Sequence, residues 1–234
     1  MIAMSEIRLQ YVFDPLCGWC YASAPALSGL ATAYPDLLEL MPSGLFADQG
    51  ARALTRDWAN YAWTNDQRIA SLTGQKFSKA YLLDVLLSNG AMFDSDVMNR
   101  ALTAVRAIDR RLEPGLLQQL QIVRYVAGQD TARADVVANV TAEFVNAAGH
   151  SIDGDELTNR LEQDVVLEEQ SNARIRATQT LMNDLGVRGV PQLVVSVDGA
   201  VTVLRGDALY EGYEPMLAVL HTLIERPRPG SALS

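Results

Sequence analysis

Two cysteines close together in the chain constrain its fold and its chemistry more than any other feature of the sequence. Cys17 and Cys20 are the only cysteines among 234 residues, and they form Cys-Gly-Trp-Cys shortly after an apolar stretch, Ile7 to Phe13. Because no other cysteine exists, the pair cannot serve a wider framework of structural disulfides and must be explained by its own chemistry. A strand, a short turn and a helix opened by C-x-x-C is the pattern of a thiol–disulfide redox site.

The spacing assigns different roles to the two thiols. The start of a helix favours the thiolate of the cysteine nearest to it, so we expect Cys17 to be the nucleophile. Cys20, one turn further along, then resolves the mixed disulfide. Two alternatives stay open: a pair of ordinary buried cysteines, or a zinc site. Structural zinc usually takes four ligands, and the only histidines, His150 and His221, lie far away in the sequence, so we expect no metal.

Composition narrows the choice of partners and compartment. The formal net charge of -9 disfavours nucleic acid and anionic membrane surfaces as partners. No run of apolar residues approaches the ~18 that a membrane span needs. The first ten residues lack the pattern of a secretory signal peptide, so we expect a cytoplasmic protein. In that compartment a C-x-x-C is more often catalytic or metal-binding than structural.

Hydrophobic periodicity predicts an α/β chain whose two ends share one sheet. Residues 1–46 and 187–226 are expected to form that discontinuous domain, 47–186 an inserted helical domain, and 227–234 a flexible tail. The expected elements are a strand at 7–13, a helix from Cys17 kinked at Pro25, a strand at 37–41, helices almost throughout 47–186, a hairpin at 192–197 and 200–204 around Asp198-Gly199, and a helix at 211–224.

Two motifs make the chain resemble the DsbA-like branch of the thioredoxin superfamily. They are Phe13-Asp14-Pro15-Leu16-Cys17-Gly18-Trp19-Cys20-Tyr21 and Gly186-Val187-Arg188-Gly189-Val190-Pro191-Gln192. In particular, the chain resembles bacterial proteins described as predicted protein-disulfide isomerases, relatives of FrnE-type oxidoreductases. The resemblance covers nearly the whole chain. It implies a thioredoxin fold, a central mixed β-sheet flanked by helices, with a large all-helical insertion between the βαβ and ββα halves.

The second motif implies a substrate-binding loop beside the cysteines. An isolated Val190-Pro191 dipeptide favours a trans bond. The resemblance instead implies a cis bond at Pro191, in a loop that stands next to Cys17. Such a bond turns the backbone N–H and C=O of Val190 outward, where an extended peptide or glutathione pairs with them. We therefore expect Val190 and Pro191 to contact the substrate.

Three further residues around the cysteines have open roles. Gly18 and Trp19 carry no charge and are expected to set the redox poise of the pair through local electrostatics and access. Trp19 is either an apolar platform for the substrate or a core residue. Asp14 either relays the proton of the resolving thiol or satisfies amides of the Asp-Pro turn.

These observations favour a thiol–disulfide oxidoreductase, and protein disulfide isomerase is one form that this activity can take. It exchanges disulfides with protein or small thiol substrates, needs no bound cofactor, and is regenerated by glutathione or thioredoxin. One alternative is a glutathione-dependent transferase or isomerase, resembling kappa-class glutathione transferases and hydroxychromene carboxylate isomerases, which have serine where Cys17 stands. Another is a non-catalytic binding module or chaperone. The direction of the reaction, and the choice between monomer and homodimer, stay open.

Overall fold

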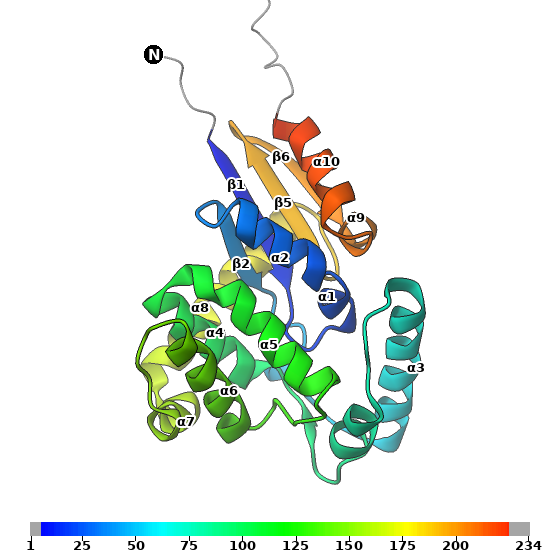
Figure 1. Cartoon of the computed structure of the whole chain (residues 1–234), viewed down its shortest axis with the longest axis vertical. Coiled ribbons are helices and arrows are strands. Elements are labelled where there is room, and N and C mark those ends of the chain that lie inside the picture. The colour runs from blue at the N-terminus through cyan, green and yellow to red at the C-terminus, as the bar shows by residue number, and fades with distance from the viewer. Residues whose placement is uncertain (1–5, 225–234) are drawn as a thin grey trace, which may run out of the picture.

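A mixed four-stranded sheet joins the two ends of the described chain. The computed structural model describes residues 6–224, and Figure 1 shows this sheet at one end of the molecule. Its strands are β1 (Ile7–Phe13), β2 (Leu38–Pro42), β5 (Gln192–Val197) and β6 (Ala200–Arg205). They lie in the order β2-β1-β5-β6, with β1 parallel to β2 and the other neighbours antiparallel. Thioredoxin-fold topology, expected from the resemblance, is therefore confirmed.

The central strand is buried on both faces, as its sequence predicts. Leu9, Tyr11 and Phe13 alternate along β1 and are fully buried, and Val12 buries the opposite face near the end of the strand. The hairpin between β5 and β6 turns at Asp198 and Gly199. Both residues have positive φ (49° and 85°), which is typical of a tight hairpin turn that matches the twist of the strands.

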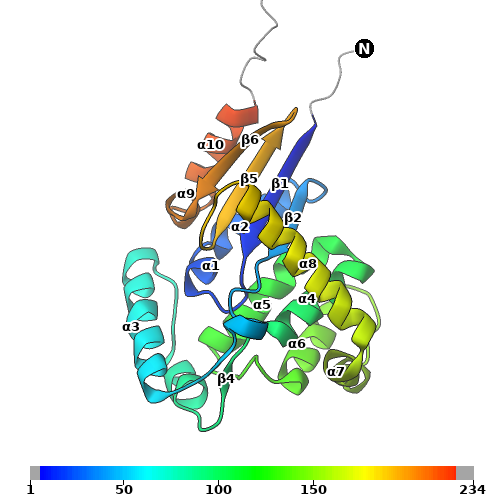
Figure 2. The ribbon, with the colours of Figure 1, turned by 180° about the vertical axis from the view of Figure 1, so that it is seen from behind.

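Helices cover both faces of the sheet. The flanking helices are α1 (Gly18–Ala22), α2 (Ala24–Ala33), α8 (Val165–Asp184), α9 (Gly206–Tyr210) and α10 (Tyr213–Ile224). Figure 1 shows α2 and α10 over one face, and Figure 2 shows α8 crossing the other, where it contacts β2. Gly29 allows α2 and α10 to approach closely, because a Cβ at that position would lie 2.0 Å from the ring of Tyr213.

One expected helix is divided in two, and the closing helix begins two residues later than expected. The helix from Cys17 does not kink at Pro25: it breaks at Ser23, and Pro25 lies in the first turn of α2. Proline is tolerated there because the N–H it lacks would have no helical partner. The closing helix begins at Tyr213, after the short α9 and Gly212, whose φ is 99°.

The middle of the chain forms a helical block at one end of the sheet. Its α-helices are α3 (Arg56–Thr73), α4 (Asp96–Ile108), α5 (Glu113–Tyr125), α6 (Ala134–Ala147) and α7 (Gly154–Gln163). It also contains short helices η1 (Asp48–Gly50), η2 (Tyr81–Leu86) and η3 (Arg110–Leu112), of which η2 is a π-helix. Two-residue strands, β3 (Arg52–Ala53) and β4 (Met92–Phe93), pair antiparallel. The expectation of helix almost throughout was therefore wrong at these two strands.

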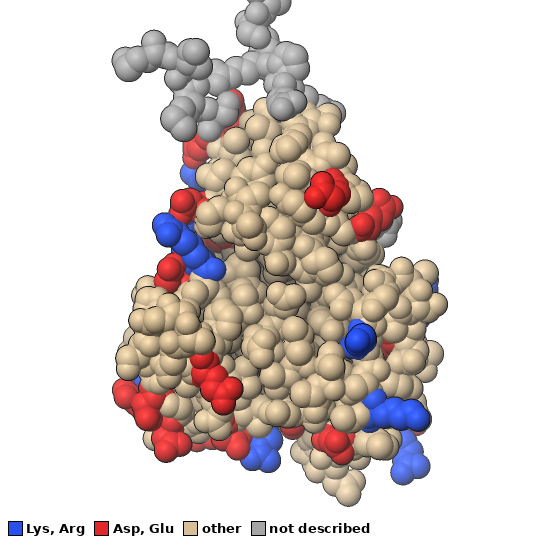
Figure 3. All heavy atoms as spheres, viewed as in Figure 1, with Lys and Arg blue, Asp and Glu red and all other residues tan. Residues whose placement is uncertain are grey.

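The predicted division into domains stays a prediction. Helix α8 falls within the expected inserted domain, yet it packs against β2 of the sheet. The expected tail, 227–234, lies outside the described residues. Within residues 6–224 no helix is both long and apolar enough to span a membrane. On the face shown in Figure 3, uncharged residues dominate, and most charged side chains gather toward the edges.

Candidate active site

The two cysteines lie at the junction between β1 and α1. Strand β1 ends at Phe13, and the turn that follows is closed by a 3.1 Å hydrogen bond from the Cys17 N–H to the Asp14 carbonyl. Cys17 is the N-cap of α1, with extended dihedral angles (φ -79°, ψ 116°), and Cys20 lies inside the helix. Both cysteines are free thiols. The strand–turn–helix arrangement predicted around the motif is thus the one observed.

The two thiols have different environments. Cys17 retains 8% of its accessible surface, whereas Cys20 retains 1%. Burial raises the pKa of the Cys20 thiol well above its ordinary value, and the hydrogen bond and charge of Cys17 raise this pKa further. Cys20 is therefore protonated at neutral pH, and Cys17 is the thiol nearer to solvent.

A loop distant in sequence faces Cys17. The Val190–Pro191 peptide bond is cis, and the loop connects α8 to β5. The Cys17 Sγ lies 3.7 Å from the Val190 carbonyl oxygen and donates a hydrogen bond to it. The structure thus brings together the two segments that the sequence singled out, although 173 positions separate Cys17 from Val190.

Trp19 lies partly buried beside the cysteines. Its ring is tilted against that of Tyr210 in α9, with 4.6 Å between the ring centroids. Tyr210 has no motif that would identify it in the sequence. Trp19 is thus neither fully exposed nor a core residue, and one side of its ring is already occupied.

Asp14 is fully buried in the turn before Cys17. Its carboxylate accepts hydrogen bonds from the Leu16 N–H (2.9 Å), the Phe46 N–H (3.0 Å) and the Ser95 hydroxyl (3.0 Å). Burial raises the pKa of Asp14 to about 6, and these three hydrogen bonds limit the rise. Asp14 therefore satisfies amides of the turn, as one interpretation predicted. Its negative charge also raises the pKa of Cys20, so the two groups are close.

Asp66 is a second buried carboxyl group at the site, and the sequence analysis missed it. It belongs to α3, is 5% exposed, and accepts a 3.1 Å hydrogen bond from the Tyr81 hydroxyl. A Cβ on Gly18 would lie 2.6 Å from Asp66 Oδ1, so a larger residue at that position requires the Asp66 side chain to move. Burial raises the pKa of Asp66 to about 7, although Tyr81 and the charge of Arg124 lower it.

A sequence signal for Asp66 does exist. The buried residues of α3 are Ala59, Ala62, Asp66 and Ile69, which recur every three or four positions. Asp66 therefore occupies a position of the apolar stripe, where a carboxyl group is unusual. The neighbouring Asn65, Gln67 and Arg68 hide this signal, because they make the segment look like a solvent-exposed face.

Side chains of the middle segment also hold the backbone around the cysteines. Three of them donate hydrogen bonds to carbonyl oxygens of this segment: Gln121 Nε2 to Pro15 (3.3 Å), the Tyr125 hydroxyl to Leu16 (2.8 Å) and Gln75 Nε2 to Tyr21 (3.1 Å). The position of Cys17 therefore depends on residues far outside the βαβ segment that carries it.

Comparison with known proteins agrees with this geometry. No family model and no curated protein matches the chain. Among solved structures, the cytosolic disulfide reductase DsbM from Pseudomonas aeruginosa is 30% identical, with a TM-score of 0.78, and the match covers 93% of this chain and 98% of that one. A structure of DsbM with GSH is 28% identical, with a TM-score of 0.77, and covers 94% and 100%.

Two more distant structures share the fold alone. One, from Nitrosomonas europaea, is 21% identical with a TM-score of 0.68, covering 93% of this chain and 96% of the other. The second is a 2-hydroxychromene-2-carboxylate isomerase, 17% identical with a TM-score of 0.57, covering 92% and 96%. The likeness to DsbM, together with the sheet topology and the helical insertion, shows that the chain belongs to the DsbA-like thiol oxidoreductases of the thioredoxin superfamily.

Proposed function

We propose that the protein is a dithiol–disulfide oxidoreductase that reduces disulfides of protein or small-molecule substrates. The observation that carries this proposal is the thiol pair at the start of α1. Cys17 is the more accessible of the two, faces the Val190 carbonyl at 3.7 Å, and precedes a buried, protonated Cys20. The similarity to DsbM, a cytosolic disulfide reductase, supports both the direction of the reaction and a cytoplasmic location.

In the proposed reaction, two electrons pass from the thiol pair to the substrate. The Cys17 thiolate attacks one sulfur of the substrate disulfide, forms a mixed disulfide, and releases the first substrate thiol. Cys20 then loses its proton and attacks the Cys17 sulfur, which releases the second substrate thiol and leaves a Cys17–Cys20 disulfide. Two thiol molecules, such as glutathione, return the electrons and become a disulfide. The DsbM structure with GSH supports glutathione as this partner.

The surrounding residues have supporting roles in this proposal. Asp14, whose pKa is about 6, is ionised at neutral pH and is the proposed acceptor for the proton of Cys20. The backbone of Val190, next to Pro191, is the proposed pairing edge for substrate. Trp19 is the proposed apolar contact beside it, and Gly18 sets the distance between the thiol pair and Asp66.

Serine variants of the two cysteines test the proposal. Cys17→Ser should abolish exchange with glutathione disulfide and with protein disulfides, whereas Cys20→Ser should accumulate a mixed disulfide on Cys17 that mass spectrometry detects. Equilibration of the wild-type pair with glutathione buffers measures its reduction potential. A value near that of thioredoxin, about -270 mV, agrees with a reductase, whereas about -120 mV would indicate a disulfide donor.

The same variants separate the alternatives. Because the 2-hydroxychromene-2-carboxylate isomerase has the same fold, a glutathione-dependent transferase or isomerase activity stays an alternative function. Glutathione conjugation or isomerisation that survives in Cys17→Ser would favour that function. Suppression of aggregation that survives in the same variant, with no exchange in the wild type, would favour a chaperone.

A further inference from the structure

Two adjoining hollows lead to the loop that contacts Cys17. Their volumes are about 650 Å³ and about 420 Å³, and they share Gly44, Leu45 and Gln179 as lining residues. We call the continuous depression they form the trench. The smaller hollow reaches Val190, whose carbonyl oxygen lies 3.7 Å from the Cys17 sulfur. The trench therefore ends at the Val190 loop, which contacts Cys17, although neither cysteine lines it.

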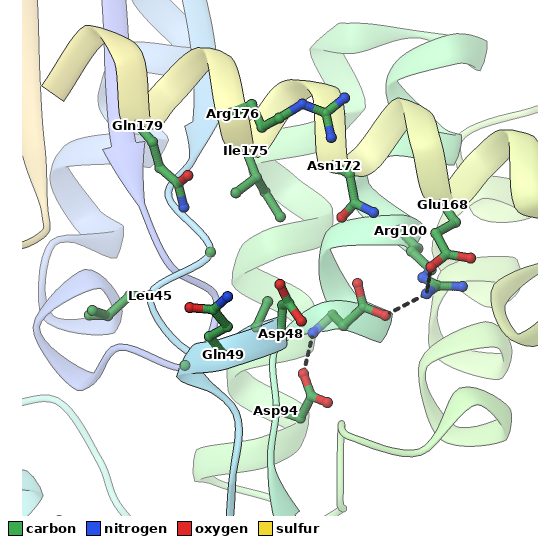
Figure 4. Close-up of a pocket in the computed structure, with 14 residues that line it drawn as sticks. Leu45, Asp48, Gln49, Asp94, Arg100, Glu168, Asn172, Ile175, Arg176 and Gln179 are labelled. Carbon is green, nitrogen blue, oxygen red and sulfur yellow. Dashed lines mark hydrogen bonds and ion pairs between the residues drawn. The ribbon is translucent and has the colours of Figure 1, made fainter. Parts of the chain in front are cut away.

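Helix α8 forms one wall of the trench and the loop after β2 forms the other. Figure 4 shows side chains of α8 pointing toward residues 44–50 across the larger hollow. The lining residues of α8 run from Glu168 to Asn183 and recur every three or four positions, so they form one stripe. At 1.5 Å of rise per residue this stripe is about 22 Å long.

The length of the trench indicates the size of its occupant. An extended peptide advances about 3.3 Å per residue, so about six or seven residues fill the trench. A tripeptide such as glutathione would span about 10 Å and leave more than half of it empty. The length of the trench therefore fits a longer segment, with a reacting cysteine at the Val190 end.

The chemistry of the lining changes along the trench. The smaller hollow contains the apolar Leu45, Met182 and Val187 and one guanidinium group, that of Arg188, whereas the larger contains four carboxylates and two guanidinium groups. Arg100 pairs with Asp96 (2.8 Å) and Glu168 (3.4 Å), and Arg176 pairs with Glu169 outside the lining. Within residues 6–224, the remaining two carboxylates, those of Asp48 and Asp94, have no ion-pair partner.

The two unpaired carboxylates repel one another. Burial raises the pKa of Asp94, and the negative charges of Asp96 and Asp48 raise it further, while Arg100 opposes the rise. A cation placed between Asp48 and Asp94 would relieve this repulsion. The larger hollow, at the end of the trench away from Val190, is therefore complementary to a basic side chain and unfavourable for an acidic one.

We propose that the trench binds an extended, basic segment of a protein substrate whose cysteine reacts with Cys17. A Lys or Arg about five to seven residues from that cysteine lies between Asp48 and Asp94. This inference rests on the proposed function and adds a substrate preference to it: basic protein segments are reduced faster than acidic ones of the same length.

Chromogenic peptides test the preference directly. Peptides of about ten residues carry one cysteine, joined by a disulfide to 5-thio-2-nitrobenzoate, and a Lys or a Glu six positions away on either side. The reduced protein passes two electrons to this disulfide, forms its own Cys17–Cys20 disulfide, and releases the peptide thiol and the coloured thiol. With the charged residue on at least one side of the cysteine, N-terminal or C-terminal, kcat/KM should be about three- to tenfold higher for the Lys peptide than for the Glu peptide.

An isosteric double variant links the preference to the trench. Asp48→Asn with Asp94→Asn removes both charges, yet asparagine tolerates the φ of 49° at position 48 and still accepts the Asp96 N–H at position 94. The Lys-to-Glu ratio of kcat/KM should fall to about one. The matched control, Glu143→Gln with Glu162→Gln, changes two exposed acids outside the trench and should keep the ratio.

Either of two outcomes would overturn the trench proposal while the proposed function stands: equal rates for Lys and Glu peptides, or a preference that survives the double asparagine variant. If the wild type reduces neither the peptides nor glutathione disulfide, the proposed function fails instead. Fluorescence anisotropy with Cys17→Ser and the reduced peptides then tests the trench alone. Tighter binding of the Lys peptide supports the trench, and equal binding refutes it.

Discussion

Ionisation of the buried Asp66 should lower the stability of the folded protein as pH rises, and Asp66→Asn should remove this pH dependence. Its pKa is about 7 in the folded protein and has an ordinary value of 3.8, a rise of about 3 units. As pH rises from 4 to 7, the unfolded chain loses this proton freely and the folded protein retains it, so folding becomes less favourable. At about 1.4 kcal/mol per unit, the accumulated loss is roughly 4 kcal/mol above pH 7.

Urea unfolding of the reduced protein at pH 5 and pH 8.5 measures this effect. Between pH 5 and pH 8.5, the free energy of unfolding of Asp66→Asn should rise by roughly 2 to 3 kcal/mol relative to that of the wild type. The difference is smaller than the full loss because pH 5 already lies about 1 unit above the pKa of Asp66 in the unfolded chain. Asp57→Asn, on an exposed position of the same helix, should gain nothing. Tyr81→Phe should strengthen the pH dependence, since the Tyr81 hydroxyl lowers the pKa of Asp66.

This reasoning would be refuted if the difference in unfolding free energy between Asp66→Asn and the wild type were the same at both pH values. It would mean that water or a relaxed helix α3 solvates the carboxylate. The same substitution has a second readout at the active site. Removing a negative charge next to Gly18 should speed alkylation of Cys17 by iodoacetamide at pH 8.5, where Asp66 is ionised, and have little effect at pH 5.5. A purely structural role for Asp66 would not produce that pH dependence.

Three more predictions concern the packing around the site. Asp14→Asn places an amide where three donors point at the carboxylate, so it should cost about 1 to 3 kcal/mol in urea unfolding at pH 7.5. Gly18→Ala should cost about 1 to 3 kcal/mol, and part of this loss should return with Asp66→Ala, because the added methyl overlaps the carboxyl group. Gly29→Ala should lower the melting temperature more than an alanine at an exposed position of α2, and Tyr213→Ala should restore part of the loss.

The parts of the site that the sequence predicted are those that depend on neighbouring residues. The strand ending at Phe13, the turn at Asp14 and the helix from Cys17 follow from alternation, an Asp-Pro pair and the C-x-x-C spacing. The hairpin at Asp198-Gly199 is equally local. The meeting of Val190 with Cys17 spans most of the chain, and it came from the family resemblance, not from periodicity.

The parts that were missed depend on which surfaces meet. Strands β3 and β4 have two residues each, too few for an alternating pattern, and exist only because their segments lie side by side. The trench requires α8 to face the loop after β2. The burial of Asp66 could be predicted only from the packing of the buried stripe of α3 against Gly18. Without that contact, a carboxyl group in a polar segment is expected to face solvent.

The helical segment does more than flank the thiol pair, because it completes the turn that positions the pair. Side chains of residues 75, 95, 121 and 125 donate hydrogen bonds to Asp14 or to backbone carbonyls between Pro15 and Tyr21. If they were removed, buried acceptors would lose their partners, each at a cost of about 1 to 3 kcal/mol. A chain that keeps only the sheet and its flanking helices should therefore retain both cysteines and still fail to hold Cys17 against Val190. In this protein the proposed redox site is therefore built jointly by the sheet and by the helical segment between β2 and β5.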